Sequence, residues 1–411
     1  MKKLLPLILL FVLPVLGFSQ ADSAVIGSGY IYQTYYSFDN GTVKQSTSDW
    51  DLAFGIGGFN VSIRTNDGHD VKLYLYPKGD VTAWGNVDTT GLSTWTSRVN
   101  NENNWDITAF TDPNANHPDY GWGVYNSTTH NVEGDSLYII QTKAGNFKKL
   151  RIDGMYTTGN FEFTYADLDG SNEVSGVVNK NDYTGKNFAY YSIDNNQVLD
   201  LEPLAEQWDI VFSKYRAPQP QGGYYNVTGI QTNKYRTSAK AEGVDVNTAD
   251  WSTQNFVQEI GTIGWDWKSF DRATMSYNIT EDLTYFVADT NDHVWQITMT
   301  GYKYNTGTFY FNQTKVANPL NVNDIDLGLN SVSVFPNPAT NNFALNIESK
   351  IAQNNLIVTV YSLTGSVVYS QNINVLNNIT LNVTTADWKK GVYLVRVGND
   401  TNAVVKQLIV Q

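Results

Sequence analysis

Short runs of β-branched and aromatic residues, broken by Gly, Asn and Asp, recur along most of the chain. Clear examples are VKLYLYP (71–77), SLYII (136–140), KKLRI (148–152), FEFTY (161–165), TYFVAD (284–289), VWQITM (294–299) and TFYFNQT (308–314). Runs of this length that alternate or stay apolar, with turn residues at both ends, predict β-strands. Beyond the N-terminus, no segment keeps the helical period over several turns. The sequence therefore predicts an all-β protein.

A series of these segments occurs twice along the chain, in the same order. The matched segments are YYSFDNGTV (35–43) with YYSIDNNQV (190–198), DWDLAF (49–54) with QWDIVF (207–212), SLYIIQTKAGNFKKLRI (136–152) with LTYFVADTNDHVWQITM (283–299), and TGNFEF (158–163) with TGTFYF (306–311). A repeat at this distance is the length of a whole domain rather than of a solenoid unit. We predict two homologous β-rich domains, residues 25–175 and 183–317.

Each copy contains a Trp-Asp pair at the start of a strand, Trp50-Asp51 and Trp208-Asp209. An Asp in such a place can accept hydrogen bonds from a neighbouring turn, while the indole ring fills the core. We expect both pairs to be parts of the core architecture.

The last part of the chain differs in pattern. Residues 318–331 are a polar, Asn-rich linker, and residues 332–411 hold pairs of short strands split by Asn, Gly and Thr. Such pairs predict a small Ig-like β-sandwich. Pro336 and Pro338 exclude a central strand at that point, because proline cannot donate to a sheet, so this segment should be an edge or an entry turn.

The N-terminus predicts export. Lys2 and Lys3 precede an apolar run over residues 4–18, and small or polar residues follow, which is the pattern of a secretory signal peptide over residues 1–20. No second apolar run is long enough to span a membrane as a helix. We therefore expect no membrane span in the mature chain.

Composition narrows the possible chemistry. The chain has no Cys, which excludes disulfides, thiolate metal sites and Cys nucleophiles. Its 40 Asp and Glu outnumber its 27 Lys and Arg, which cluster nowhere, so nucleic acid is not an expected partner. No GxSxG, HExxH, Walker or GxGxxG-helix motif occurs. We expect no enzyme activity.

The C-terminal residues resemble the type A sorting domain of the type IX secretion system of Bacteroidetes. The resemblance is carried by FPNP (Phe335, Pro336, Asn337 and Pro338), VYSLTGSVV (360–368, with Gly365), GVYLVRV (391–397, starting at Gly391) and KQLIV (406–410, starting at Lys406). It implies that the secretion machinery recognises this domain as a partner and carries the protein across the outer membrane. The implied localisation is secreted or at the cell surface.

Each copy also resembles the HmuY family of haem-binding proteins. The residues that carry this are the aromatic pair before Ser, the Trp-Asp strands, and WGVY (122–125) and WKSF (267–270). The resemblance implies haem as a cofactor, with its iron held between two His or Met side chains on loops at one end of a domain. We expect no other metal. The family's His position after the WxxF strand holds Ser127 and Arg272.

The ligand-binding candidates nearest to the family's positions are His117, His130 and Met275. Only the first copy offers a complete axial pair, His117 with His130, because residues 239–265 of the second hold neither His nor Met. The leading expectation is an exported ligand-binding protein that captures haem. The alternative is a non-haem surface module that binds glycans or proteins through exposed aromatics, with Trp84, Trp95, Trp122, Trp251 and Trp265 as the residues to inspect.

Overall fold

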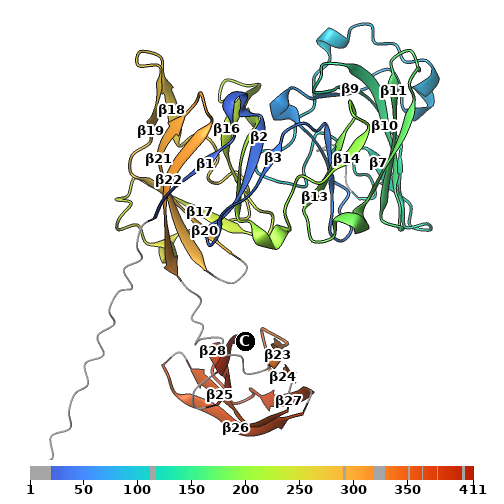
Figure 1. The fold of residues 1–411 in the computed structure, drawn as a ribbon. Helices are drawn as coiled ribbons and strands as arrows, with labels where there is room; N and C mark the ends of the chain where they lie inside the picture. Colours follow the sequence, from blue (N-terminus) through green and yellow to red (C-terminus); the bar gives the residue numbers. More distant parts are fainter. Residues whose placement is uncertain are drawn as a thin grey trace, which may run out of the picture. The chain divides into compact units, whose positions relative to one another are not determined.

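A computed structural model describes residues 20–111, 117–289, 293–317, 329–349, 352–362, 364–376, 378–399 and 403–411. Nearly all of the expected signal peptide and most of the 318–331 linker lie outside these ranges. The chain divides into two compact units, Met1–Ala317 and Asn318–Gln411 (Figure 1). The described residues form β-strands and short 3-10 helices without any α-helix. The prediction of an all-β protein is confirmed.

The first unit consists of two lobes, each a sandwich of two antiparallel sheets. Lobe 1 comprises residues 48–202. Its inner sheet has the order β14-β13-β4-β5, and its outer sheet runs β12-β11-β10-β8-β7, with β9 pairing β10 and β6 pairing β9. The strands are β4 (Leu52–Gly55), β5 (Ile63–Thr65), β6 (Lys72–Leu75), β7 (Gly123–Tyr125), β8 (Val132–Gly134), β9 (Leu137–Gln141), β10 (Phe147–Met155), β11 (Asn160–Asp167), β12 (Val174–Asn179), β13 (Phe188–Ser192) and β14 (Gln197–Leu199).

Lobe 2 comprises residues 20–47 together with 203–317. Its inner sheet has the order β16-β15-β2-β3, its outer sheet the order β1-β22-β21-β20-β17, and β18-β19 is a separate hairpin. The strands are β1 (Gln20–Val25), β2 (Tyr32–Ser37), β3 (Gly41–Thr47), β15 (Ile210–Pro218), β16 (Tyr224–Thr232), β17 (Thr237–Glu242), β18 (Lys268–Asp271), β19 (Ser276–Ile279), β20 (Leu283–Ala288), β21 (Val294–Lys303) and β22 (Thr308–Ala317).

Single 3-10 turns join these strands. They are η1 (Ser28–Tyr30), η2 (Asp67–His69), η3 (Val81–Gly85), η4 (Leu92–Thr94), η5 (Lys180–Tyr183), η6 (Ala205–Gln207) and η7 (Trp251–Thr253). No helix among the described residues has the length and apolarity needed to cross a membrane.

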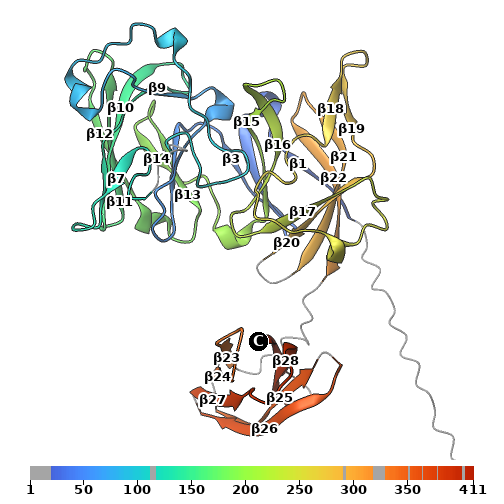
Figure 2. The same ribbon diagram turned by 180° about the vertical axis from the view of Figure 1, so that it is seen from behind.

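The two sequence copies exchange their first hairpins. β2 from the first copy pairs with β15 from the second, with Tyr36 opposite Ile210, and β13 from the second pairs with β4 from the first, with Tyr190 opposite Ala53. Figure 2 shows β3 beside the strands of lobe 2 and β13 and β14 within lobe 1. Each inner sheet therefore contains strands from both predicted domains, so the two lobes do not coincide with residues 25–175 and 183–317. The physical reason is that each hairpin buries its apolar face in the partner copy's core.

The Trp-Asp pairs hold this exchange in place. The carboxylate oxygen Oδ2 of Asp51 accepts a hydrogen bond from the backbone N–H of Ile193 at 2.7 Å, and Oδ2 of Asp209 accepts one from the N–H of Phe38 at 2.9 Å. Each Asp thus caps the hairpin contributed by the other copy. The expected capping role is present, and it acts between copies.

The exchanged hairpins turn at equivalent places. Gly41 at the end of the first turn has φ +76°, and its counterpart Asn196 has φ +48°. Gly and Asn are the residues that adopt this left-handed conformation at least cost. Both copies therefore reach the same hairpin with different residues.

The second unit is the small sandwich that the sequence predicted. One sheet has the order β23-β24-β27 and the other β26-β25-β28-β29. The strands are β23 (Leu329–Phe335), β24 (Asn342–Ser349), β25 (Gln353–Ser362), β26 (Val367–Val375), β27 (Asn378–Thr384), β28 (Gly391–Gly398) and β29 (Ala403–Val410). β23 lies at the edge of its sheet and ends at Phe335, as the two prolines that follow require.

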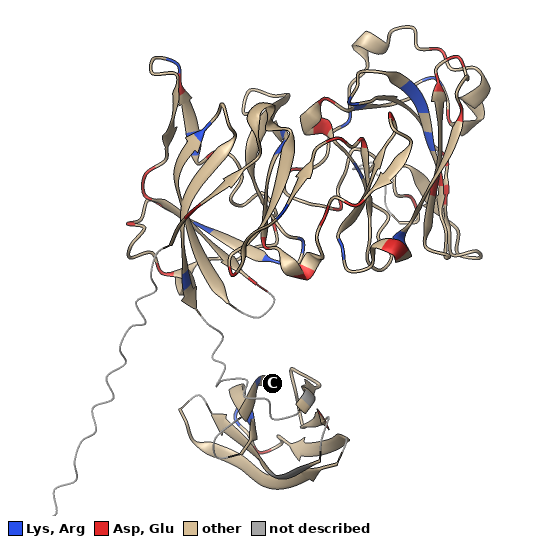
Figure 3. Cartoon of the chain, in the orientation of Figure 1, with Lys and Arg blue, Asp and Glu red and all other residues tan. Residues whose placement is uncertain are grey.

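Charge is spread thinly over the described strands. Figure 3 shows Lys and Arg well separated, except for a short run on β10. Two of its members form ion pairs, Lys148 with Asp167 and Arg151 with Asp153, and Lys149 lies over the ring of Trp84. Such an arrangement leaves little free positive charge for a polyanion.

Candidate functional site

The two candidate histidines of the first copy lie at one end of lobe 1, around one tyrosine. The ring of Tyr125, at the end of β7, has its centroid 5.5 Å from that of His117 and 6.1 Å from that of His130. His130 lies in the turn between β7 and β8, and His117 lies ahead of β7. Both histidines therefore contact the same tyrosine ring.

Each histidine is oriented through the same ring nitrogen. Nδ1 of His130 is 2.6 Å from the hydroxyl of Tyr125, and Nδ1 of His117 is 3.1 Å from the hydroxyl of Tyr120. Among the described residues, no hydrogen bond reaches Nε2 of either ring. Histidines that bind a metal commonly have this arrangement, in which a hydrogen bond at one ring nitrogen fixes the ring and the other nitrogen is open to the metal.

Phe59 completes this cluster, which we call the histidine edge (Phe59, His117, Tyr120, Tyr125 and His130). Phe59 is 53% exposed, and its ring contacts those of Tyr120 at 6.1 Å and Tyr125 at 5.6 Å between centroids. Sequence reasoning missed Phe59 because it arrives from the β4–β5 loop, far from the histidines along the chain. Only the tertiary fold brings it to them.

A cleft of about 460 Å³ adjoins the histidine edge and is lined by Phe59, His130, Met155 and Lys180. Met155 is almost fully buried, yet it also reaches this cleft. The Lys180 ammonium donates to the backbone oxygens of Gly58 and Asn60, both at 3.0 Å, and so holds the loop that carries Phe59. Burial lowers the pKa of Lys180 to about 8.

Met275 occupies the matching place in lobe 2. Trp122 and Trp267 are counterparts, and His130 and Met275 each follow eight residues later in left-handed conformations, with φ +58° and +53°. Met275 is 60% exposed at the tip of the β18–β19 hairpin. It is therefore not brought together with His117 or His130, and it belongs to a separate end of the molecule.

The remaining two histidines lie outside the strands. His69 lies in η2 and is half-buried against lobe 2, and burial lowers its pKa to about 3. His293 is bonded through Nδ1 to a carboxylate oxygen of Asp289 at 2.8 Å. Neither contributes to the histidine edge.

The FPNP motif is hydrogen-bonded to the C-terminal strand, β29. The side chain of Asn337 donates to the backbone oxygen of Gln407 at 2.9 Å and accepts from the N–H of Ile409 at 2.8 Å, both on β29. Phe335 is 72% exposed, and Lys406 is also exposed. Gly365 provides a left-handed turn with φ +81°, and Gly391 begins β28.

Comparison with known proteins identifies the second unit. Residues 333–411 match the family described as "Secretion system C-terminal sorting domain". The protein is sorted by type IX secretion, and its localisation is secreted or at the cell surface. The C-terminal domain implies interaction with the secretion machinery. A search of curated proteins found no match.

Two solved structures share little with this chain. Dimeric latent PorU from Porphyromonas gingivalis is 10% identical, with a TM-score of 0.18, over 83% of this chain and 34% of that one. A fungal alcohol oxidase of the AA5 family, in complex with copper, is 11% identical, with a TM-score of 0.15, over 70% of this chain and 90% of that one. These values carry no argument about residues 20–317, and none of the findings supports the HmuY resemblance.

Proposed function

We propose that residues 20–317 form a non-catalytic binding protein that takes haem at the histidine edge of lobe 1. The observation that carries the proposal is that His117 and His130 both contact Tyr125, and each is held at Nδ1 by a tyrosine hydroxyl. Imidazole Nε2 atoms are common axial ligands of haem iron, and a hydrogen bond at Nδ1 fixes the ring orientation that ligation needs.

The rest of the edge fits a porphyrin chemically. Phe59 and Tyr125 offer aromatic surface, and the adjoining cleft of about 460 Å³ has the size of a small-molecule site. When bound, haem would supply an iron centre for axial coordination. Lobe 2 has only Met275 at the corresponding place, so the proposal assigns one haem to each chain.

Titration of the purified full chain with haemin tests this proposal. We expect a shifted and sharpened Soret band that saturates at one haem per chain. His117→Ala and His130→Ala should each change the band, and together they should abolish it. The matched control is His293→Ala, which removes a histidine from a turn of lobe 2 and should leave the titration unchanged. No Soret change, or an unchanged band in the double variant, overturns haem binding at this edge.

A second candidate, glycan binding, is favoured by one observation. Phe270, the counterpart of Tyr125, also lies in an exposed aromatic cluster, with ring centroids 5.1 Å from Tyr277 and 6.4 Å from Tyr304. Aromatic side chains that expose a face can pack on sugar rings. The tryptophans first considered for this role fit it poorly: Trp122 is buried, and Trp84, Trp95, Trp251 and Trp265 are half-buried against small clusters.

A glycan array separates the two candidates. Binding that is lost in Phe270→Ala and retained in the His117→Ala, His130→Ala double variant supports a carbohydrate ligand. Absence of binding to any glycan removes this candidate.

A further inference from the structure

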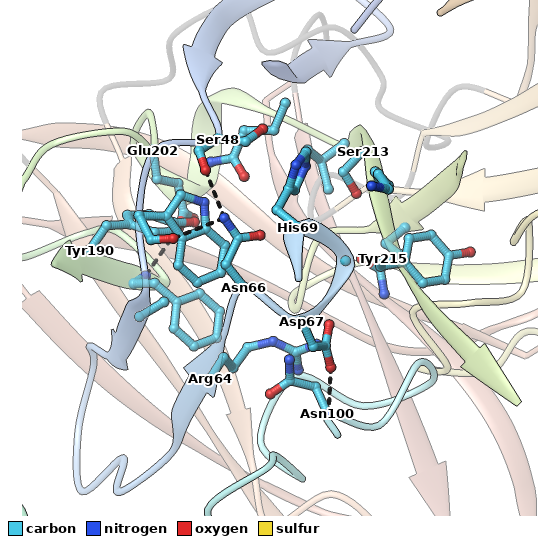
Figure 4. A pocket seen from close by; sticks show the side chains of 18 of the residues that line it. Ser48, Arg64, Asn66, Asp67, His69, Asn100, Tyr190, Glu202, Ser213 and Tyr215 are labelled. Atoms are coloured by element: carbon cyan, nitrogen blue, oxygen red, sulfur yellow. Dashed lines mark hydrogen bonds between the residues drawn. The ribbon is translucent and has the colours of Figure 1, made fainter. Parts of the chain in front are cut away.

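A cavity of about 60 Å³ lies between the inner sheets of the two lobes and is lined by both polar and apolar side chains. It is lined from lobe 1 by Trp50 and Tyr190, and from lobe 2 by the counterpart residues Trp208 and Tyr35. Each Trp packs edge-on against the Tyr of the other copy, at 5.1 Å for Trp50 with Tyr190 and 5.0 Å for Trp208 with Tyr35. Figure 4 shows the polar side chains gathered around this space.

Unpaired buried polar atoms concentrate here. In the described part of the chain, six buried side-chain atoms have no hydrogen-bond partner, and five of them belong to residues that line this cavity. They are Trp50 Nε1, Trp208 Nε1, Thr65 Oγ1, Tyr215 OH and Asn187 Oδ1. An unsatisfied buried polar group costs about 1–3 kcal/mol. The hydroxyl of Tyr215 points away from the cavity toward Gly229 (Figure 4), and the other four groups indicate that a polar occupant satisfies them.

The unpaired atoms are chiefly donors. The two indole N–H groups can only donate, and the hydroxyl of Thr65 can donate as well. Asn187 Oδ1 is the one pure acceptor of the four that remain. An occupant that matches this lining must accept several hydrogen bonds and need donate few.

The buried charge at the cavity points the same way. The guanidinium of Arg64 is buried and donates to the backbone oxygens of Asn104 and Trp105, both at 3.1 Å. Among the described residues, no carboxylate lies within ion-pair distance of it; burial lowers the pKa of Arg64 to about 10, and the charge of Asp67, a buried residue that also lines the cavity, opposes that shift. Burial raises the pKa of Glu202 to about 8, so this carboxyl group adds no negative charge at neutral pH.

We propose that the interlobe cavity is a binding site for a small monovalent anion, held by the indole N–H groups of Trp50 and Trp208 and by the charge of Arg64. One water needs about 10–15 Å³ of such space, so the cavity has room for an ion of chloride or formate size with a few waters. Because its donors come from both lobes, the bound anion joins the two inner sheets. This site is separate from the histidine edge and independent of haem binding.

Crystals of the full chain grown in bromide test the site directly. We expect an anomalous peak in the cavity, within hydrogen-bond distance of both indole nitrogens. Density for waters alone, or a bromide found elsewhere only, overturns the proposal.

Thermal unfolding tests it in solution. At fixed ionic strength, replacing gluconate, which is too large for the cavity, with chloride should raise Tm progressively, because a ligand that binds only the folded state stabilises it. The Trp50→Phe, Trp208→Phe double variant keeps an aromatic ring at each position and removes both donors, and it should lose this dependence. Trp122→Phe is the matched control, since its Nε1 already donates to Val61 O at 2.9 Å.

The outcomes are distinct. Trp122→Phe should lower Tm and keep the chloride dependence. If the double variant keeps the full chloride dependence, or gains stability in every salt because two unpaired donors have been removed, no anion occupies the cavity.

Discussion

The hydroxyl oxygens of Tyr35 and Tyr190 lie 2.9 Å apart across the boundary between the lobes. These residues occupy the same place in the two copies, so a duplicated residue bonds to its own counterpart. Each of the two tyrosines also packs edge-on against the Trp of the other copy.

Tyr190→Phe should reduce the free energy of unfolding by about 1 kcal/mol, because it removes the bond to Tyr35 and leaves a buried hydroxyl with one partner fewer. Urea denaturation measures this. The Tyr35→Phe, Tyr190→Phe double variant should cost less than the two single variants added together, since both lose the same bond. Strict additivity would show that the two hydroxyls are not coupled.

Asp209 and Asp51 should respond differently to the same substitution. Asp209 forms a buried ion pair with Arg236 at 2.7 Å, whereas Asp51 accepts from the backbone of Lys143 and Ile193. Asp209→Ala leaves a buried charge unpaired and should cost about 3–5 kcal/mol. Asp51→Ala should cost about 1–3 kcal/mol, through lost hydrogen bonds alone. Equal losses in denaturation experiments would contradict this assignment.

Glu202 should make stability depend on pH. Burial raises its pKa from 4.5 to about 8, so the folded state binds this proton more tightly than the unfolded state does. Its contribution is full below pH 4.5 and is lost as pH rises through 8, by at most about 1.4 kcal/mol per pH unit. Unfolding measured from pH 5 to 9 should show a flatter profile for Glu202→Gln. An unchanged profile would show that a group other than Glu202 causes the pH dependence of stability.

The hairpin exchange predicts which fragments fold. Residues 48–202 contain every strand of lobe 1, whereas residues 25–175 lack β13 and β14, which complete its inner sheet. The first fragment should show cooperative unfolding by circular dichroism, and the second should not. Cooperative folding of 25–175 alone would show that the exchange is not needed.

Deletion of residues 333–411 should leave the protein in the periplasm, because the sorting domain is the part that the secretion machinery recognises. Cell fractionation measures this. The truncated chain should keep the unfolding profile of the first unit, since the core of residues 20–317 shares no residue with that of the second unit. Surface delivery without the tail would contradict this role.

The sequence by itself determined the strand content, the duplication, the C-terminal sandwich and the export route, because each follows from the order of residues within short segments. Turn residues and apolar runs identify strands whatever their partners. The spacing of FPNP, the turn Gly365 and the final strand identified the sorting domain. The Asp capping role was also readable, since an Asp beside a strand has few other uses.

Only the tertiary structure decided which strands pair and which side chains meet. β2 and β13 are buried on both faces because the two inner sheets pack against each other, and a run of buried residues does not say which sheet receives it. The exchange of hairpins, the meeting of Tyr35 with Tyr190, and the arrival of Phe59 beside Tyr125 are all contacts between segments distant in sequence. Such contacts depend on how sheets close and stack, which no local pattern records.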